Sequence, residues 1–274
     1  MKIDFHSHSS FSNDSQAPIE DMVKGAIEKG ITHLAFTDHI DYDYDEDGVT
    51  SDWAFDLDQY FETIESLKEK YQSQIQLHTG VELGVQPHLG ERCNKLVHQY
   101  AFDFVIASLH TVDRKDLYNK KYFKTRTPEQ ALREYYDSYY NSVIQLDDFS
   151  VLGHLDLYLR YWEPLKSEPI KNYFDQIEML YKHLIQNEKG IEVNSGGYFK
   201  YNLMSNNPSD DLLKFYKSLK GEVITLGSDA HTPEHIGTLH DDNLKRLDAI
   251  GFKYVCTFKA MKPEYHSIKT LLYT

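Results

Sequence analysis

Asp4-Phe5-His6-Ser7-His8 (DFHSH, residues 4–8) follows directly on the short run that opens the chain. In an extended segment, side chains two residues apart point the same way, so His6 and His8 can face one metal ion. Neutral imidazole suits zinc, iron and manganese. Asp4 shares this face and is expected to orient a ligating imidazole from an outer shell. Taken alone, the pattern is equally open to a surface histidine pair.

Further ligand-type side chains stand where other strand-like runs end. They are His39 in TDH (37–39), Glu82 in GVELG (80–84), His110 in SLH (108–110), His154 in GHLD (153–156), and Asp229 and His231 in GSDAH (227–231). Each could equally be a capping or hydrogen-bonded polar residue. Six strand ends that all finish in His or a carboxylate favour a shared site, because the carboxyl ends of barrel strands meet at one mouth.

The order of the elements indicates the fold class. Strand-like runs occupy residues 2–5, 33–37, 75–83, 102–109, 150–152, 190–193, 222–226 and 253–258, and helix-like stretches occupy 18–29, 56–71, 128–146, 170–187 and 208–220. This alternation predicts an α/β protein with a mostly parallel sheet or barrel and helices outside it. No break in composition divides the chain, so residues 1–274 are expected to form a single domain.

Two longer segments, residues 41–51 and 111–127, are expected to be loops. The first is acidic and the second is basic and aromatic, and both follow ligand-bearing strand ends. They are therefore expected to overhang the barrel mouth as lids or substrate walls, with ordinary solvated loops as the alternative.

Composition narrows the function classes. The formal net charge of −14 argues against general binding of nucleic acid, which rewards basic surfaces. No apolar run approaches the roughly 20 residues needed to span a bilayer. Two cysteines without a CxxC motif, and an N-terminus that lacks an apolar signal region, predict a reduced, cytoplasmic protein.

DFHSHS, TDH, GVELG, SLH, GHLDL and GSDAH occur in the order expected of the PHP (polymerase and histidinol phosphatase) superfamily, which this sequence resembles from residue 4 to about residue 237. The combination is specific, although no single motif is. GHLDLYLR (153–160) followed by EVNSGG (192–197) looks most like the stand-alone histidinol-phosphate phosphatases of that superfamily. The resemblance implies a distorted (β/α)7 TIM-like barrel with a trinuclear metal site at its C-terminal mouth.

The resemblance also implies a ligand set for three divalent ions, which would be zinc, iron or manganese. His6, His8, Glu82 and Asp229 would hold the first ion; Glu82, His110 and His154 the second; Asp14, His39 and His231 the third. Asp14 is the weakest member, because other branches of the superfamily often carry His there. Its surroundings also resemble a cap before a helix.

A phosphate monoester is the expected small-molecule partner. Three divalent ions would outweigh the three carboxylates among their ligands and leave positive charge for a phosphate dianion. They would also lower the pKa of bound water, so that no Ser or Cys nucleophile is required. Arg160, six residues after His154, is expected to bind phosphate oxygens in the reaction, with a surface salt bridge as the alternative. Arg126 is a second candidate for substrate binding.

The expected function is therefore histidinol-phosphatase, a phosphoric monoester hydrolase of histidine biosynthesis. One alternative is a PHP-family phosphoesterase that acts on nucleotides or DNA ends. Another is a non-catalytic metal-binding domain, and a third is a metal-dependent amidohydrolase, which would need a metal-bridging lysine in mid-barrel. Glu192 and Asn194 end a further strand at the same mouth, where an outer-shell, substrate-binding or purely structural role is open.

Overall fold

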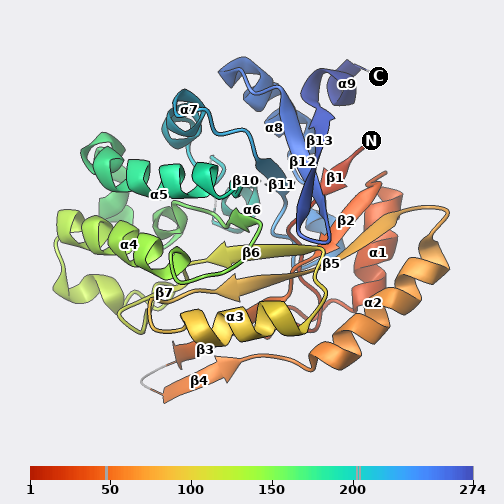
Figure 1. Cartoon of the computed structure of the whole chain (residues 1–274), viewed down its shortest axis with the longest axis horizontal. Coiled ribbons are helices and arrows are strands. Elements are labelled where there is room, and N and C mark those ends of the chain that lie inside the picture. Colours follow the sequence, from red (N-terminus) through yellow and green to blue (C-terminus); the bar gives the residue numbers. More distant parts are fainter. Residues whose placement is uncertain (47–48, 202, 204, 274) are drawn as a thin grey trace.

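Seven parallel strands form the barrel in the computed structural model, which describes residues 1–273 except 47, 48, 202 and 204. Figure 1 shows the chain with most of its elements labelled. Their spatial order is β1 (Ile3–Asp4), β2 (His33–Phe36), β5 (Gln76–Gly84), β6 (Phe104–Ser108), β9 (Val151–Leu152), β10 (Gly190–Asn194) and β11 (Ile224–Gly227). Backbone contacts between the β1 and β11 regions close the ring. Phe5 N–H donates to Leu226 O at 2.8 Å, and Ser7 forms a parallel β-bridge with Ala230. The predicted barrel is confirmed.

The second position of the barrel is split, which distorts the ring. β2 pairs with the first half of β5, and β3 (His39–Glu46) pairs with its second half, placing His39 beside Glu82. β3 then continues beyond the barrel and turns back as β4 (Val49–Trp53) in an antiparallel hairpin. The prediction of a loop at residues 41–51 is therefore wrong, because alternating aromatic residues such as Tyr44 and Trp53 let this acidic segment pair as strands.

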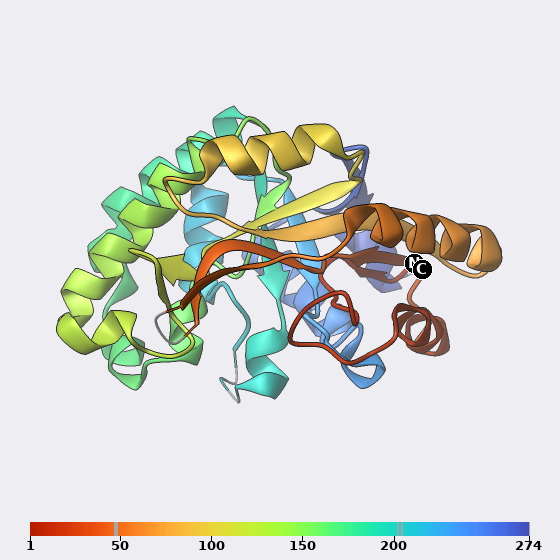
Figure 2. The ribbon, with the colours of Figure 1, turned by 90° about the horizontal axis from the view of Figure 1, so that it is seen from below.

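Helices form an arc outside the strands (Figures 1 and 2). They are α1 (Ile19–Glu28), α2 (Leu57–Tyr71), α3 (Gly90–Gln99), α4 (Pro128–Val143), α5 (Phe174–Gln186), α6 (Gly196–Lys200), α7 (Asp210–Ser218), α8 (His240–Ile250) and α9 (Ile268–Tyr273). The five predicted helices are present. Local signals fix several ends: Thr127 and Gln130 make a capping box at α4, and Asp56 caps α2.

The strand expected at residues 253–258 lies outside the barrel ring. It is β12 (Tyr254–Lys259), which pairs antiparallel with β13 (Lys262–Ser267) as a separate hairpin. Cys256 and Phe258 of β12 pack with interior residues of the barrel, namely Phe5, Ala35, Phe104, Ile106, Val151 and Val223. The hairpin thus closes the amino-terminal end of the barrel, here called the floor, with apolar side chains.

The segment expected as a loop at residues 111–127 holds the short hairpin of β7 (Thr111–Val112) and β8 (Lys115–Asp116) and a 3₁₀ turn. Asp116 and Tyr118 from this segment line the cavity at the barrel mouth, together with Tyr44 and Trp53 of the β3–β4 hairpin. The prediction that both segments form walls of the mouth is therefore confirmed. In the described part of the chain, we find no helix with the length and apolarity that a membrane crossing requires.

Candidate metal centre

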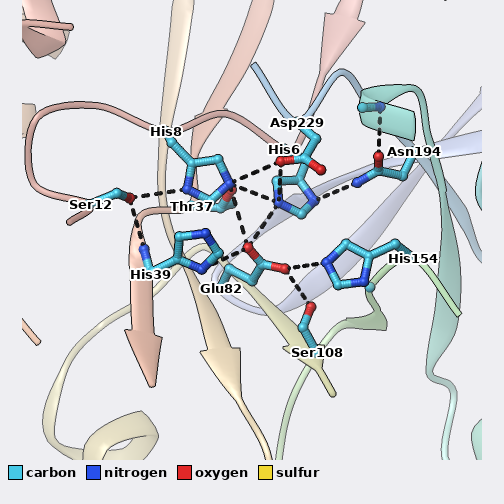
Figure 3. Close-up of polar contacts among 12 residues, drawn as sticks. His6, His8, Ser12, Thr37, His39, Glu82, Ser108, His154, Asn194 and Asp229 are labelled. Atoms are coloured by element: carbon cyan, nitrogen blue, oxygen red, sulfur yellow. Dashed lines mark hydrogen bonds and ion pairs between the residues drawn. The ribbon is translucent and has the colours of Figure 1, made fainter. Parts of the chain in front are cut away.

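His6 and His8 lie in the segment that follows β1. Both are buried, and His6 Nε2 lies 3.0 Å from His8 Nε2 (Figure 3). His6 Nε2 is also 3.1 Å from a carboxylate oxygen of Glu82, and His8 Nε2 is 3.5 Å from Asp229 Oδ1. The four side chains expected to share one metal ion therefore surround one small volume.

The other two expected groups flank this one. His154 Nε2 and His110 Nε2 lie 2.8 and 3.3 Å from Glu82 Oε1, so Glu82 stands between both groups. On the opposite side, His231 Nε2 lies 2.9 Å from Asp14 Oδ2, and His39 Nε2 lies 3.8 Å from Asp14 Oδ1.

Asp14 belongs to this cluster and does not cap a helix, since α1 begins only at Ile19. The structure therefore brings all nine predicted side chains together at one end of the barrel.

A second layer of side chains fixes the ring nitrogens that face away from the cluster. Glu192 Oε2 lies 2.8 Å from His6 Nδ1, Ser12 Oγ lies 3.1 Å from His8 Nδ1, and Asp41 Oδ1 lies 2.7 Å from His110 Nδ1. Each contact directs the Nε2 atom toward the centre, which is the usual arrangement behind metal-bound histidines. The geometry thus places Glu192 in the outer layer.

Asp4 has a different role from the expected one. Its carboxylate accepts bonds from Ser228 N and Oγ and from Gly237 N, at 2.8, 2.5 and 2.8 Å, and from the backbone of His6 at 3.3 Å. It touches no imidazole ring in these contacts, and it ties the ligand-bearing segments after β1 and β11 together. The alternation of side chains could not predict these partners, because Ser228 and Gly237 are more than 220 residues away along the chain.

Burial and nearby charges oppose each other in the titration of the cluster. Burial favours neutral His6, but the carboxylates of Glu192, Glu82 and Asp229 outweigh burial and raise its pKa well above the usual value. The pKa of Glu82 is lowered despite its burial, because His6, His39 and His110 surround it. Without a metal ion, His6 therefore favours its protonated form beside ionised Glu82, whereas burial lowers the pKa of His8 and of His154.

The donor set fits divalent metal ions. Ligand atoms of four overlapping triads lie within 4.8 Å of one another: His6, His8 and Glu82; Glu82, His110 and His154; His8, His39 and His231; His39, Asp41 and His110. Imidazole nitrogens and carboxylate oxygens in this mixture suit zinc, iron or manganese. Several imidazole nitrogens face one another without an intervening hydrogen-bond acceptor, an arrangement that a shared cation would stabilise.

A cavity of about 350 Å³ opens above the cluster. Arg160 lines it, from the 3₁₀ turn Leu157–Arg160 that follows His154. Within the described chain, Arg126 is absent from the cavity lining. Its guanidinium instead pairs with Glu134 and Asp113 and lies over the Tyr122 ring, so its expected substrate contact has no geometric support.

Several lining residues were missed by the sequence reasoning. Asp41 and Asp116 place carboxylates in the cavity, Lys200 adds an amine, and Tyr161 and Tyr201 add aromatic faces. Lys200 comes from α6, and no lysine of a described barrel strand lines the cavity, which disfavours the amidohydrolase alternative. These residues follow no motif, and their position after ligand-bearing strands was the one available signal.

Relatives of known structure and sequence share this architecture. A histidinol-phosphatase of Lactococcus lactis is 29% identical over 95% of this chain and 96% of its own, and a probable histidinol-phosphatase of Thermotoga maritima is 30% identical over 92% and 94%. The crystal structure of the histidinol phosphate phosphatase from Lactococcus lactis, complexed with zinc, L-histidinol and phosphate, matches with a TM-score of 0.85 and 28% identity over 96% of this chain and 98% of that chain. The PHP domain model matches residues 4–196. The chain belongs to the PHP domain family.

Proposed function

We propose that this protein is a metal-dependent phosphomonoesterase that hydrolyses L-histidinol phosphate to L-histidinol and phosphate, a step of histidine biosynthesis. One observation carries the proposal. Nine ligand-type side chains converge at the mouth of a barrel that matches, over nearly its whole length, a relative holding zinc, L-histidinol and phosphate. We also propose that the whole chain forms one catalytic domain, since the C-terminal hairpin closes the barrel floor.

The residues would hold three divalent ions in the groups given above, with Glu82 between two of them. Bound there, such ions supply Lewis acidity and lower the pKa of a coordinated water molecule. The protein itself contributes fixed ligand geometry, because the outer-layer contacts of Glu192, Ser12 and Asp41 hold the imidazole rings. We place the protein in the cytoplasm, which agrees with its two free cysteines.

The phosphate group would lie between the cluster and the cations of the cavity wall. Arg160 and Lys200 both line the cavity, and Lys200 Nζ lies 3.8 Å from Asp14. Their charges offset those of the phosphate dianion, and the N–H groups of Arg160 can donate to its oxygens. The place of Arg160 in the cavity lining supports its expected role in binding phosphate oxygens.

The histidinol part carries an amine and an imidazole, and other residues of the cavity lining suit cations. Asp41 and Asp116 provide buried carboxylates, while Tyr44 and Trp53 stack with their ring centroids 4.3 Å apart beside them. Of the acidic hairpin, Asp41 is thus the carboxylate that lines the cavity and could attract the cationic part of the substrate. Asp43 faces His88 instead, at 2.9 Å.

The test is turnover of a phosphate-ester panel by metal-reconstituted protein. Histidinol phosphate should be preferred over simple alkyl phosphates, mononucleotides and oligonucleotides with phosphorylated ends. Arg160→Ala should lower kcat/KM on the order of 10²-fold, whereas Arg126→Ala, an arginine outside the cavity lining, should leave it within twofold. Faster turnover of nucleotides or DNA ends than of histidinol phosphate would replace this proposal with the phosphoesterase alternative.

A further inference from the structure

Arg160 is held on three sides although it lines an open cavity. Its Nη1 donates to Asp229 Oδ2 at 2.9 Å, its Nη2 to Asn194 Oδ1 at 2.7 Å, and its Nε to Asn207 Oδ1 at 3.1 Å. The side chain is only 4% exposed. A guanidinium has five N–H groups, so one N–H on each terminal nitrogen remains for another acceptor.

Asn207 is the partner that the nine-residue cluster does not explain. It is fully buried and bridges Asn194 through two backbone bonds of 2.9 and 2.7 Å. Its Nδ2 donates to Asp156 Oδ1 at 2.6 Å, and the other Asp156 oxygen accepts from Ser209 N at 2.9 Å. Asp156 is itself buried and lies outside the predicted ligand set.

The Asp156 carboxylate decides which way the Asn207 amide points. An amide has two orientations of nearly the same shape, but only its nitrogen can donate to a carboxylate. With the nitrogen on Asp156, the oxygen must face Arg160 Nε. The reversed amide would set N–H groups against the guanidinium and leave the carboxylate facing an oxygen, and both contacts would be repulsive.

Two adjacent glycines leave room for this arrangement. A Cβ at Gly196 would lie 2.5 Å from Asp229 Oδ2, and a Cβ at Gly197 would lie 2.8 Å from Asn207 Oδ1. Both oxygens accept bonds from Arg160. The Ser-Gly-Gly sequence after β10 therefore provides the space in which Arg160 is fixed.

We propose that Asp156 and Asn207 are positioning residues that hold the Arg160 guanidinium in one plane, so that its two free N–H groups face the phosphate of the substrate. This inference rests on the proposed function. Neither residue touches the substrate; each acts through Arg160. Loss of the relay should therefore weaken phosphate binding, because a guanidinium that can rotate loses its fixed two-pronged geometry.

The experiment is a double-mutant cycle between Asn207→Leu and Arg160→Ala on the metal-loaded enzyme. The readouts are KM for histidinol phosphate, kcat and the inhibition constant of inorganic phosphate. Asn207→Leu alone should raise KM and the inhibition constant roughly 10- to 100-fold, with a smaller change in kcat. In the Arg160→Ala background it should change neither constant further.

Asp156→Asn is a second variant that keeps the size of the side chain, and it should raise KM and the inhibition constant in the same way. It serves as the test if Asn207→Leu fails to fold. Asn206→Leu is the matched control, since Asn206 is also buried and its amide bonds to Asn243. It should lower the melting temperature without changing phosphate inhibition. Equal effects of Asn207→Leu in both backgrounds, or the same kinetic change in the Asn206 control, would overturn the relay. Absence of histidinol phosphate turnover in the unaltered enzyme would instead overturn the proposed function.

Discussion

His78 at the floor of the barrel and His6 at its mouth are both buried, and their pKa values shift in opposite directions. At the floor, burial lowers the pKa of His78 to about 4, and its ring packs 4.9 Å from that of Phe5. At the mouth, nearby carboxylates outweigh the burial of His6 and raise its pKa. The floor is therefore built for apolar packing, and the mouth concentrates buried charge. We infer that the packed floor stabilises the barrel, while the mouth is shaped for binding cations.

The largest expected effect tests the mouth. Glu82→Gln keeps the size of a buried side chain that contacts His6, His39, His110 and His154, and it removes the charge. Activity should fall on the order of 10⁴-fold, which corresponds to about 5 kcal/mol in the barrier. Elemental analysis should show loss of bound metal, whereas the exposed control Glu65→Gln should match the unaltered enzyme. Activity retained within tenfold would refute a bridging role for Glu82.

A change at the floor should lower stability and leave the kinetic constants unchanged. Phe104 is buried, and its ring lies 5.2 Å from that of Phe5 and 5.1 Å from that of Phe258. Phe104→Ala should lower the free energy of unfolding by about 3–5 kcal/mol, because it leaves a cavity between barrel and hairpin. Denaturant unfolding measures this loss, and kcat and KM per folded molecule should stay within twofold. A large kinetic defect with unchanged stability would erase the contrast between the two ends.

Acid should reveal the buried histidine of the floor. His78 is 1% exposed, with a folded pKa of about 4 against an ordinary value of 6.5. Below pH 6.5 the unfolded chain takes up the proton first, so stability falls as the pH drops toward 4, by about 3 kcal/mol in total. His78→Leu should remove this part of the acid sensitivity.

The comparison for His78→Leu is His98→Gln, an exposed histidine on α3, since changes at the mouth then cancel between the two variants. Thermal unfolding between pH 7 and pH 4 is the measurement. Parallel stability profiles for both variants would show that the pKa of His78 is the same in the folded and unfolded chain, and would contradict the effect of its burial beside Phe5.

The ligand-bearing strand ends could be predicted from the sequence because each ligand residue stands where an apolar run ends. His39 is an instructive case: its register opposite Glu82 depends on the split between β2 and β3, which no local signal marks. The hairpin of β3 and β4 was missed because its acidic residues favour a loop, while its pairing is supported by cross-strand contacts such as that of Tyr44 with Trp53.

Residues that act through other residues were the hardest to predict. Arg160 stands six residues after His154, so position along the chain pointed to it. Asn207 reaches Arg160 from 47 residues away, and Asp41 reaches His110 from 69 residues away, through folding alone. Arg126 is the opposite case. Its basic and aromatic surroundings predicted a place in the cavity lining, but its guanidinium pairs with Glu134 of α4. Pairing across the fold decided the roles of Asn207 and Asp41, whereas a local ion pair decided that of Arg126.

The smallest expected effect separates the outer layer of the mouth from its ligands. Asp41 Oδ1 accepts the Nδ1 proton of His110 at 2.7 Å, and thereby directs Nε2 to the cluster. Asp41→Asn keeps an acceptor of the same shape but loses the charge, so metal affinity should fall roughly tenfold. Competition with a coloured chelator measures that affinity. Asp43→Asn, two residues along the same hairpin and bonded to His88, should leave it unchanged. Equal losses in both variants would mean that the general charge of the hairpin attracts the ions, and that orientation of His110 contributes nothing.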